Sequence, residues 1–368
     1  MTIMTASALA ASETGSTPDN TASSRVLVTG GGGFLGRAIV DQLLARGATV
    51  RSISRGDYPA LRDIGVETLR ADLADADAVR EAARGCDAVM HVAALAGIWG
   101  RRADFWQANA VGTQHVIDAC RAEGVPRLIY TSSPSVVQTD DDCEGGDESM
   151  PVPPRHRTHY QASKAEGERL VLAANGPGLA TVSLRPRLIW GPGDNHLVPR
   201  LVARAEAGRV RLIDGGRKKV DTIYITDAAA AHLCALDRLV AAGDAAHTAA
   251  CAGKAYFISG GDPRPFHEVL NRILQACGGP QITRSIPAGL AFAVGGVMEV
   301  LWTVLPLAGE PVMTRFLARQ LATANWYDIS AARRDLGFSP AVAFDEGLVQ
   351  LGSWWVESKT GAVAMVLW

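Results

Sequence analysis

Apolar residues along the chain follow two alternating spacings, which predict strands and helices in turn. Short apolar runs typical of strands fall at residues 25–29, 49–54, 67–71, 88–92, 127–131 and 181–185. Between them, apolar positions recur at helical spacing over residues 36–46, 76–83, 109–123 and 160–175. Such alternation predicts an α/β fold with a doubly wound parallel sheet that carries helices on both faces.

This alternation loosens after residue 190, which suggests a second lobe. Residues 191–220 and 261–350 predict a smaller, mostly helical C-terminal substrate lobe. The sheet-forming core would then comprise residues 25–190 with returns near 221–260. The two lobes therefore interleave in the sequence, and no single boundary separates them.

A glycine-rich segment directly follows the first predicted strand. Gly30, Gly33 and Gly36 are spaced three residues apart, with Phe34 and Leu35 between the last two, and a helix follows. Glycine permits the unusual backbone angles of such a turn and the close approach of a diphosphate. The helix N-terminus favours the anion. This arrangement predicts dinucleotide binding by a Rossmann-type sheet.

The residues that end the second strand indicate which dinucleotide binds. An acidic residue there would accept hydrogen bonds from a ribose 2′-OH, whereas a cation would accommodate a 2′-phosphate. Ser54 and Arg55 occupy this place and favour NADPH. Arg55 could also be an ordinary solvated surface residue, and Asp57 is close by, so NADH stays possible.

Four further residues are predicted to contact the cofactor from the ends of the third and fourth strands. Asp72 and Leu73 could bracket the adenine through a carboxylate hydrogen bond and an apolar contact. Ala93 and Ala94 are small, as a close passage of the cofactor requires.

Tyr160 and Lys164 lie one helical turn apart, so they share a helix face. A phenol ordinarily titrates near pH 10. A neighbouring ammonium would lower the pKa of Tyr160 and make it a usable proton donor. Ser133, at the end of the fifth strand, would hold a substrate carbonyl beside it.

Taken together, these motifs resemble those of the extended short-chain dehydrogenase/reductase family. The resemblance implies a catalytic set of Asn109, Ser133, Tyr160 and Lys164, in which Lys164 also holds the nicotinamide ribose and Asn109 holds a proton-relay water. It also implies cofactor contacts at the segment that contains Arg185 and Pro186. The matching segments are residues 29–36, 72–73, 91–94, 109–113, 130–133, 160–164 and 184–186.

Within this family, the chain resembles the 3β-hydroxysteroid dehydrogenase-like branch, and there the reductases of bacterial long-chain olefin biosynthesis. The resemblance rests on residues 58–61, 184–194, 219–225 and 253–259. It implies NADPH-dependent reduction of the 3-keto group of a long-chain 2-alkyl-3-oxoalkanoate to the 3-hydroxy acid. The alternative is a 3β-hydroxysteroid or sterol-4-carboxylate 3-dehydrogenase; a non-catalytic nucleotide-sensing module and a sugar-nucleotide epimerase fit less well.

Residues 288–307 favour a lipid-like substrate. Glu299 is the sole charge in this segment. Three interpretations are open: an ordinary packed helix, an apolar lid over the substrate, or a helix that rests on a membrane surface. Its apolar face comprises Phe292, Val294, Val297, Met298, Leu301, Trp302 and Leu305. A nearby basic cluster is either solvated or pairs with a substrate carboxylate; it comprises Arg209, Arg211, Arg217, Lys218 and Lys219.

Composition and charge indicate which partners and which cellular compartment to expect. A net charge of -2 gives no electrostatic reason to expect nucleic acid as a partner. Six scattered cysteines indicate reduced thiols rather than a metal site. Residues 1–24 contain no Lys or Arg and suggest a disordered leader, and residues 356–368 form a tail without a recognised match. We expect a cytoplasmic homodimer, with peripheral membrane contact as a further option.

Overall fold

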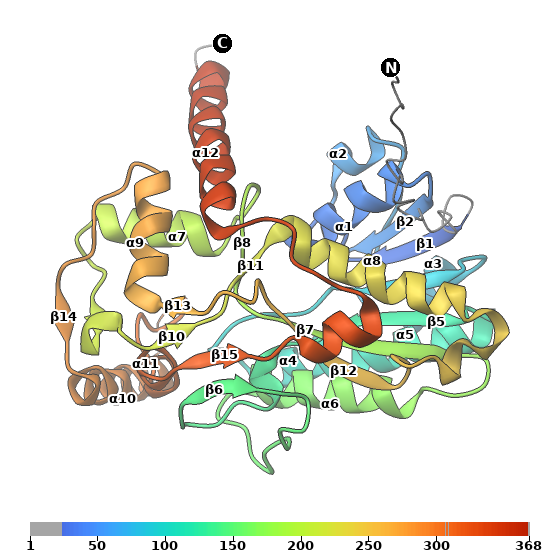
Figure 1. Ribbon diagram of the computed structural model, residues 1–368, viewed down its shortest axis with the longest axis horizontal. Coiled ribbons are helices and arrows are strands. Elements are labelled where there is room, and N and C mark those ends of the chain that lie inside the picture. Colours follow the sequence, from blue (N-terminus) through green and yellow to red (C-terminus); the bar gives the residue numbers. More distant parts are fainter. Residues whose placement is uncertain (1–23, 306, 308, 367–368) are drawn as a thin grey trace, which may run out of the picture.

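The computed structural model describes residues 24–305, 307 and 309–366. The predicted leader lies outside these residues except for Ser24. The predicted tail falls partly within them, because the long helix α12 (Phe344–Val366) runs through residues 356–366. This helix projects from the body of the molecule (Figure 1).

The central sheet has seven parallel strands in the order β12-β7-β5-β4-β1-β2-β3. All six predicted core strands are confirmed, with ends that shift by one residue, and a seventh is added from the later part of the chain. The strands are β1 (Arg25–Thr29), β2 (Thr49–Ser54), β3 (Glu67–Arg70), β4 (Ala88–His91), β5 (Arg127–Thr131), β7 (Ala180–Pro186) and β12 (Lys254–Ile258). Because β1 lies between β2 and β4, the strand order reverses there and a crevice opens at the carboxyl ends.

Helices cover both faces of this sheet (Figure 1). One face carries α1 (Phe34–Ala45) and α8 (Ile225–Ala241), which pack on each other. The opposite face carries α3 (Ala76–Ala83), α5 (Gly112–Glu123) and α6 (His159–Ala173). Short connections are α2 (Pro59–Arg62), η2 (Pro134–Val136) and η4 (Gly243–Thr248).

The predicted helix 109–123 begins earlier than expected. The helical run starts with α4 (Arg102–Trp106), passes through a π-helical turn η1 (Gln107–Val111) and continues as α5. A π turn inserts an extra residue and shifts the helical repeat. The apolar spacing before residue 112 therefore does not match a regular helix.

Side chains along each central strand alternate between the two faces of the sheet, and both faces are buried under helices. Val26 and Val28 pack with α1 and α8, whereas Leu27 between them packs with α3 and α5. Successive residues of a strand point to opposite faces. Strands that are covered on both faces therefore read as continuous apolar runs.

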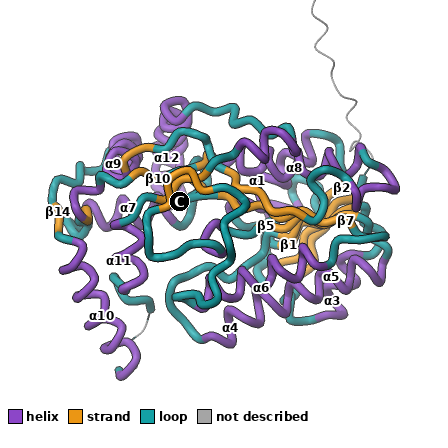
Figure 2. Tube along the Cα trace, turned by 60° about the horizontal axis from the view of Figure 1, so that its bottom comes forward, coloured by secondary structure: helices purple, strands orange, loops and turns teal. Residues whose placement is uncertain are grey.

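The second lobe contains helices and short strands. Its helices are α7 (Leu197–Glu206), α9 (Phe266–Ala276), α10 (Ala288–Val304), α11 (Arg315–Ala322) and the turns η3 (Asp214–Gly216) and η5 (Ala332–Leu336). Figure 2 shows α10 and α11 at the end of the molecule away from the central sheet. The sequence did not predict a small sheet and two strand pairs. The small sheet contains β13 (Arg264–Pro265), β10 (Lys219–Val220), β15 (Asn325–Tyr327) and β6 (Cys143–Gly146). The two pairs are β11 (Ile223–Tyr224) with β8 (Ile189–Trp190), and β14 (Ser285–Ile286) with β9 (Leu212–Ile213).

A buried ion pair fixes α6 against the sheet. Two guanidinium nitrogens of Arg185, in β7, donate to the two carboxylate oxygens of Glu168, in α6, at 3.0 and 2.6 Å. The hydroxyl of Ser183 donates to the same carboxylate at 2.9 Å. Both charged side chains are at least nine-tenths buried. The pair therefore sets the position of the helix that carries Tyr160 and Lys164.

Replacing Glu168 with Gln should strongly destabilise the fold. The change leaves the buried guanidinium of Arg185 without a countercharge, which costs about 3–5 kcal/mol when one partner of a buried pair is removed. Glu166→Gln is a matched control on the same helix, because Glu166 pairs with the exposed Arg169. Urea denaturation should show a loss below about 1 kcal/mol for the control. Equal losses in the two variants would contradict the role of the buried pair.

Candidate active site

The glycine turn after β1 leaves no room for side chains. A Cβ at Gly36 would lie 2.1 Å from the carbonyl oxygen of Gly30, and one at Gly31 would lie 2.6 Å from the hydroxyl of Ser52. Gly30 also has a φ of +72°, which favours glycine. Helix α1 starts behind this turn with no side-chain cap and no acidic residue in its first turn. Its N–H groups thus suit a phosphate.

A cavity of about 630 Å³ runs from this turn along the carboxyl ends of the strands. It brings together most of the predicted site residues, which come from six different strand ends and from α6. Those on its wall are Gly30, Gly33, Phe34, Leu35, Gly36, Ser54, Arg55, Asp72, Leu73, Ala93, Ala94, Ser133, Tyr160, Lys164 and Pro186. The shape and the glycine turn fit a nicotinamide dinucleotide.

Arg185 does not lie on this wall, and its role as a cofactor contact stays a prediction. Its guanidinium is held by Glu168 and lies 5.1 Å from the ring centroid of Phe257. Alternate residues of a strand face opposite sides of the sheet. Pro186 lines the cavity, and Arg185 does not.

Asn109 is also absent from the wall, because its amide joins two neighbouring segments. The side-chain oxygen accepts from the N–H of Leu95 at 2.7 Å. The side-chain nitrogen donates to the carbonyl of Leu95 at 2.9 Å and to the hydroxyl of Ser163 at 3.0 Å. Both amide hydrogens are therefore used, and Asn109 positions the loop after β4 against α6. Its role in holding a relay water stays a prediction.

Lys164 reaches the end of β5 inside the protein. Its Nζ donates to the carbonyl oxygen of Thr131 at 2.6 Å and lies 4.1 Å from the ring centroid of Tyr130. Burial disfavours the charged ammonium and lowers the pKa of Lys164 to about 7. The group can consequently lose and regain a proton near neutrality.

The expected influence of Lys164 on Tyr160 is not what the structure shows. Desolvation raises the pKa of Tyr160 above its ordinary value, and a hydrogen bond with Ser133 opposes this rise. The polar partner of the Lys164 ammonium is the carbonyl of Thr131 instead. Tyr160 therefore keeps its phenolic proton at neutral pH.

His91 connects strand ends and is not a base. The hydroxyl oxygen of Thr29 accepts from the N–H groups of Val92 and Ala93, each at 3.0 Å, so its proton goes to Nδ1 of His91. Nε2 of His91 then donates to the hydroxyl of Thr113 at 2.9 Å. Burial lowers the pKa of His91 to about 3, which keeps it neutral.

Other wall residues were missed as site residues by sequence reading. The ring of Tyr58 covers the glycine turn, since a Cβ at Gly32 would lie 2.4 Å from it. Asp194 starts α7: its carboxylate accepts from the N–H groups of His196, Leu197 and Val198. A signal for Asp194 existed, because an acidic residue after a Gly-Pro-Gly turn is typical of a helix start.

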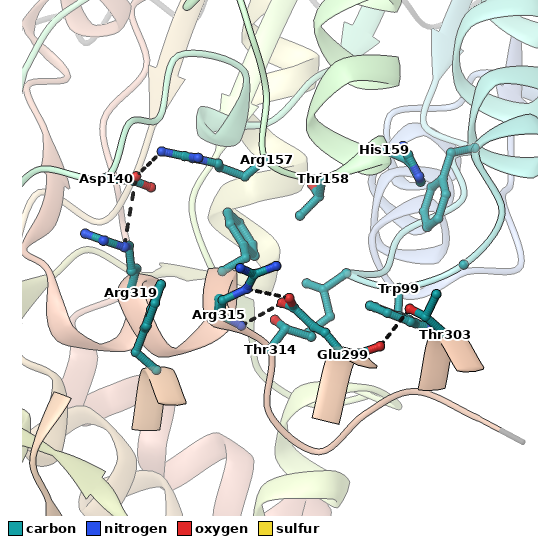
Figure 3. A pocket seen from close by; sticks show the side chains of 15 residues that line it. Trp99, Asp140, Arg157, Thr158, His159, Glu299, Thr303, Thr314, Arg315 and Arg319 are labelled. Carbon is teal, nitrogen blue, oxygen red and sulfur yellow. Dashed lines mark hydrogen bonds and ion pairs between the residues drawn. The ribbon is translucent and has the colours of Figure 1, made fainter. Parts of the chain in front are cut away.

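A second cavity of about 540 Å³ lies between the segments that contain Trp99 and His159 and helices α10 and α11 (Figure 3). Its wall includes Phe105, whose ring meets that of Tyr160 edge-on at 6.5 Å between centroids. Trp99 and His159 lie at this end of the cavity in Figure 3. Helices α10 and α11 supply the opposite wall, with Phe292 and Phe316 among its residues. The wall of this cavity therefore combines aromatic and charged side chains.

Arginines line this second cavity, and each faces a carboxylate. Arg315 donates from its backbone N–H and its side chain to Glu299, at 2.8 and 2.6 Å. Arg157 and Arg319 both approach Asp140, at 2.5 and 4.0 Å. None of the predicted basic cluster lines either cavity: Arg209, Arg211, Arg217, Lys218 and Lys219 lie elsewhere.

Helix α10 is not an ordinary packed helix, because only Ala291 and Gly295 along it are buried. Its inner side supplies Phe292, Glu299 and Thr303 to the cavity wall. Leu301 is 42% exposed and does not line the cavity. The exposed apolar residues on and after the helix are Leu290, Val294, Val297, Val300, Leu301, Val304, Leu305 and Leu307.

Across residues 24–305, 307 and 309–366, no helix is long and apolar enough to cross a membrane. Within the same described residues, no group of three or more His, Cys, Asp or Glu side chains could hold a metal ion.

The sequence profile of the 3-beta hydroxysteroid dehydrogenase/isomerase family matches residues 27–287. The chain belongs to this family. It is 50% identical over 329 residues to a 2-alkyl-3-oxoalkanoate reductase of Stenotrophomonas maltophilia, covering 89% of this chain and 98% of the relative. It is 44% identical over 335 residues to a 2-alkyl-3-oxoalkanoate reductase of Shewanella oneidensis, covering 89% and 85%.

Solved structures show the same fold. A dTDP-glucose 4,6-dehydratase from Streptomyces venezuelae, a double mutant with NAD bound, superposes with a TM-score of 0.70 at 24% identity. The match covers 91% of this chain and 98% of the other. The chain is thus an oxidoreductase of the hydroxysteroid dehydrogenase family on a Rossmann-type fold.

Tyr160→Phe should reduce turnover by about two to four orders of magnitude, the usual contribution of a general acid. Cofactor binding should stay nearly unchanged, because only the hydroxyl is removed. Tyr58→Phe is the control, because it removes the same hydroxyl from a ring that covers the glycine turn. This variant should keep a turnover near that of the wild type. Steady-state rates and cofactor titration check both. Near-normal turnover in Tyr160→Phe would contradict the assignment.

Proposed function

We propose that the protein reduces the 3-keto group of a long-chain 2-alkyl-3-oxoalkanoate to the 3-hydroxy acid, with NADPH as the reductant. One observation carries the proposal: Tyr160 lines a cavity that fits a dinucleotide, and its ring packs on Phe105, which lines a second cavity with aromatic walls. Two relatives that match most of this chain bear the name of this reductase.

The side chains around Tyr160 can perform the proton chemistry of such a reduction. When bound, a reduced nicotinamide supplies a hydride for the carbonyl carbon. Ser133 and Tyr160 are placed to hold the keto oxygen, and Tyr160 donates the proton that turns it into a hydroxyl. Lys164 lies one helical turn further on and exchanges protons near neutral pH.

The preference for NADPH rests on the charges at the end of β2. The side chain of Arg55 is exposed and makes no hydrogen bond or ion pair within the described part of the chain. Asp57 is engaged by Arg62, and this contact lowers the pKa of Asp57. The acidic residue is thus occupied, whereas the cation at Arg55 is free to meet a 2′-phosphate.

Arg55→Ala should weaken NADPH binding by about 1.5–3 kcal/mol, the range for hydrogen bonds to charged groups. NADH binding should change little, since NADH has no 2′-phosphate. Arg55→Lys, which keeps the charge, should retain part of the preference. Fluorescence titration of each variant with both cofactors measures the difference. Equal losses for the two cofactors, or a wild-type preference for NADH, would exclude this role.

The alternative function is a 3β-hydroxysteroid or sterol-4-carboxylate 3-dehydrogenase. The matching family supports it, and the same Ser133, Tyr160 and Lys164 would serve the oxidative direction. A non-catalytic nucleotide-sensing module is disfavoured, because all three side chains line one cavity with the glycine turn.

The outer face of α10 supports peripheral contact with a lipid surface, which we propose as a partner of the protein. Its exposed residues are apolar, and the single charge of the helix, Glu299, turns inward to Arg315. A hydrophobic substrate could then pass from that surface to the cavity behind the helix. The homodimer stays a prediction from the sequence.

A panel of 2-alkyl-3-oxoalkanoates of increasing chain length tests the proposed function. Each buried methylene contributes up to about 0.8 kcal/mol, so kcat/KM should rise up to about fourfold per carbon until the cavity is full. Sterol-4-carboxylates, assayed in the oxidative direction, serve as the comparison. A flat dependence on chain length, or a higher kcat/KM for sterols, would overturn the proposal.

A further inference from the structure

A groove between α10 and α11 extends the substrate cavity. Its volume is about 300 Å³. The groove is open because several residues that line it are small. Ala288 and Gly289 come from α10, and Ala318 and Ala322 come from α11. A long apolar chain would fit such a space without displacing a large side chain.

The groove and the substrate cavity are neighbours, because three residues line both: Asp140, Phe292 and Arg319. In Figure 3, Asp140 and Arg319 lie at the opposite end of the cavity from Trp99 and His159. The groove therefore begins where the cavity is farthest from the catalytic end. A chain that starts at Tyr160 would enter the groove after crossing the whole cavity.

Phe292 and Arg319 form a partition at this junction. The guanidinium carbon of Arg319 lies 4.9 Å from the ring centroid of Phe292. Its charge faces Asp140, which is also paired with Arg157. The single carboxylate of Asp140 offsets one of these two positive charges, and the ring of Phe292 and the methylene stem of Arg319 supply apolar surface beside it.

The two helices that enclose the groove are held together independently of a substrate. Glu299 of α10 binds Arg315 at the start of α11. A small separate core below them contains Ile213, Ala291 and Ala318. The groove is therefore preformed, which reduces the entropy lost when a flexible chain binds.

We propose that the groove binds the distal part of one of the two alkyl chains of the substrate, and that Phe292 and Arg319 separate it from the catalytic cavity. This inference rests on the proposed function. A 2-alkyl-3-oxoalkanoate carries two chains on adjacent carbons, and only one of them can follow the cavity into the groove. The groove would then set the preferred length of that chain alone.

Gly289→Leu tests this proposal by filling the groove. No atom lies within 4 Å of a Cβ built at Gly289, so the substitution does not force a backbone shift. Leucine is also a better helix former than glycine. Val349→Leu is the control, because Val349 is 71% exposed on α12 and lines neither the groove nor the cavities. Both variants are assayed with substrates in which the two chains are lengthened independently.

We expect Gly289→Leu to lower kcat/KM about tenfold or more for long substrates, as the loss of two buried methylenes predicts. The preferred length of one chain should shorten by several carbons, with short substrates and the other chain unaffected. Gly289→Ala should give a smaller, graded effect, and Val349→Leu none. These results would support the groove as a chain-binding site.

Two outcomes would overturn the inference. Unchanged length dependence for both chains would show that the groove is not used. A loss that is equal for short and long substrates in both Gly289 variants would show a structural effect instead. A wild-type protein that reduces none of these substrates would contradict the proposed function itself, which is a separate result.

Discussion

Buried hydrogen bonds at the carboxyl ends of β1 and β5 hold the crevice of this protein together. At β5, the carbonyl of Thr131 accepts from Lys164 of α6, and its hydroxyl donates to Nε2 of His232 in α8. One residue thus joins the helices of both layers. At β1, Thr29 binds the loop after β4 and, through His91, the start of α5. Buried polar groups that lack a partner are costly, so each of these bonds restricts the position of several elements.

The catalytic helix depends on this framework as well as on its own sequence. Glu168 and Arg185 fix α6 to β7, while Asn109 fixes it to the loop after β4. Tyr160 is therefore held from two sides. The same packing removes water from Lys164 and Tyr160. It lowers the pKa of Lys164 and raises that of Tyr160, so that the neutral form of each is favoured. Structural and chemical roles are thus shared by neighbouring residues of one helix.

The second lobe is packed less completely than the core around the central sheet. Helix α10 has an apolar outer face that is exposed and an inner face that lines the cavity, with Glu299 turned inward. An exposed apolar face is costly unless something covers it. The small residues between α10 and α11 likewise leave space rather than fill it. Both features leave apolar surface without protein contacts, as the proposed apolar substrate would require.

Much of the dinucleotide site could be predicted because its residues occupy fixed places relative to strand ends. Gly30, Ser54, Asp72 and Ala93 each follow a strand, and parallel strands bring their carboxyl ends to one edge. Arg185 and Asn109 could not be placed in this way, because their partners Glu168, Leu95 and Ser163 are revealed only by folding. The pairing of β6 with β15 was missed for the same reason.

 The sequence by itself determined the order of strands and helices, the glycine turn and the spacing of Tyr160 and Lys164, since these depend on local geometry. Only the tertiary structure decided that the carbonyl of Thr131 binds Lys164, that Leu95 and Ser163 engage Asn109, and which face of α10 lines the cavity. These contacts join residues far apart in the chain, and their burial and hydrogen bonding exist only once the layers have packed.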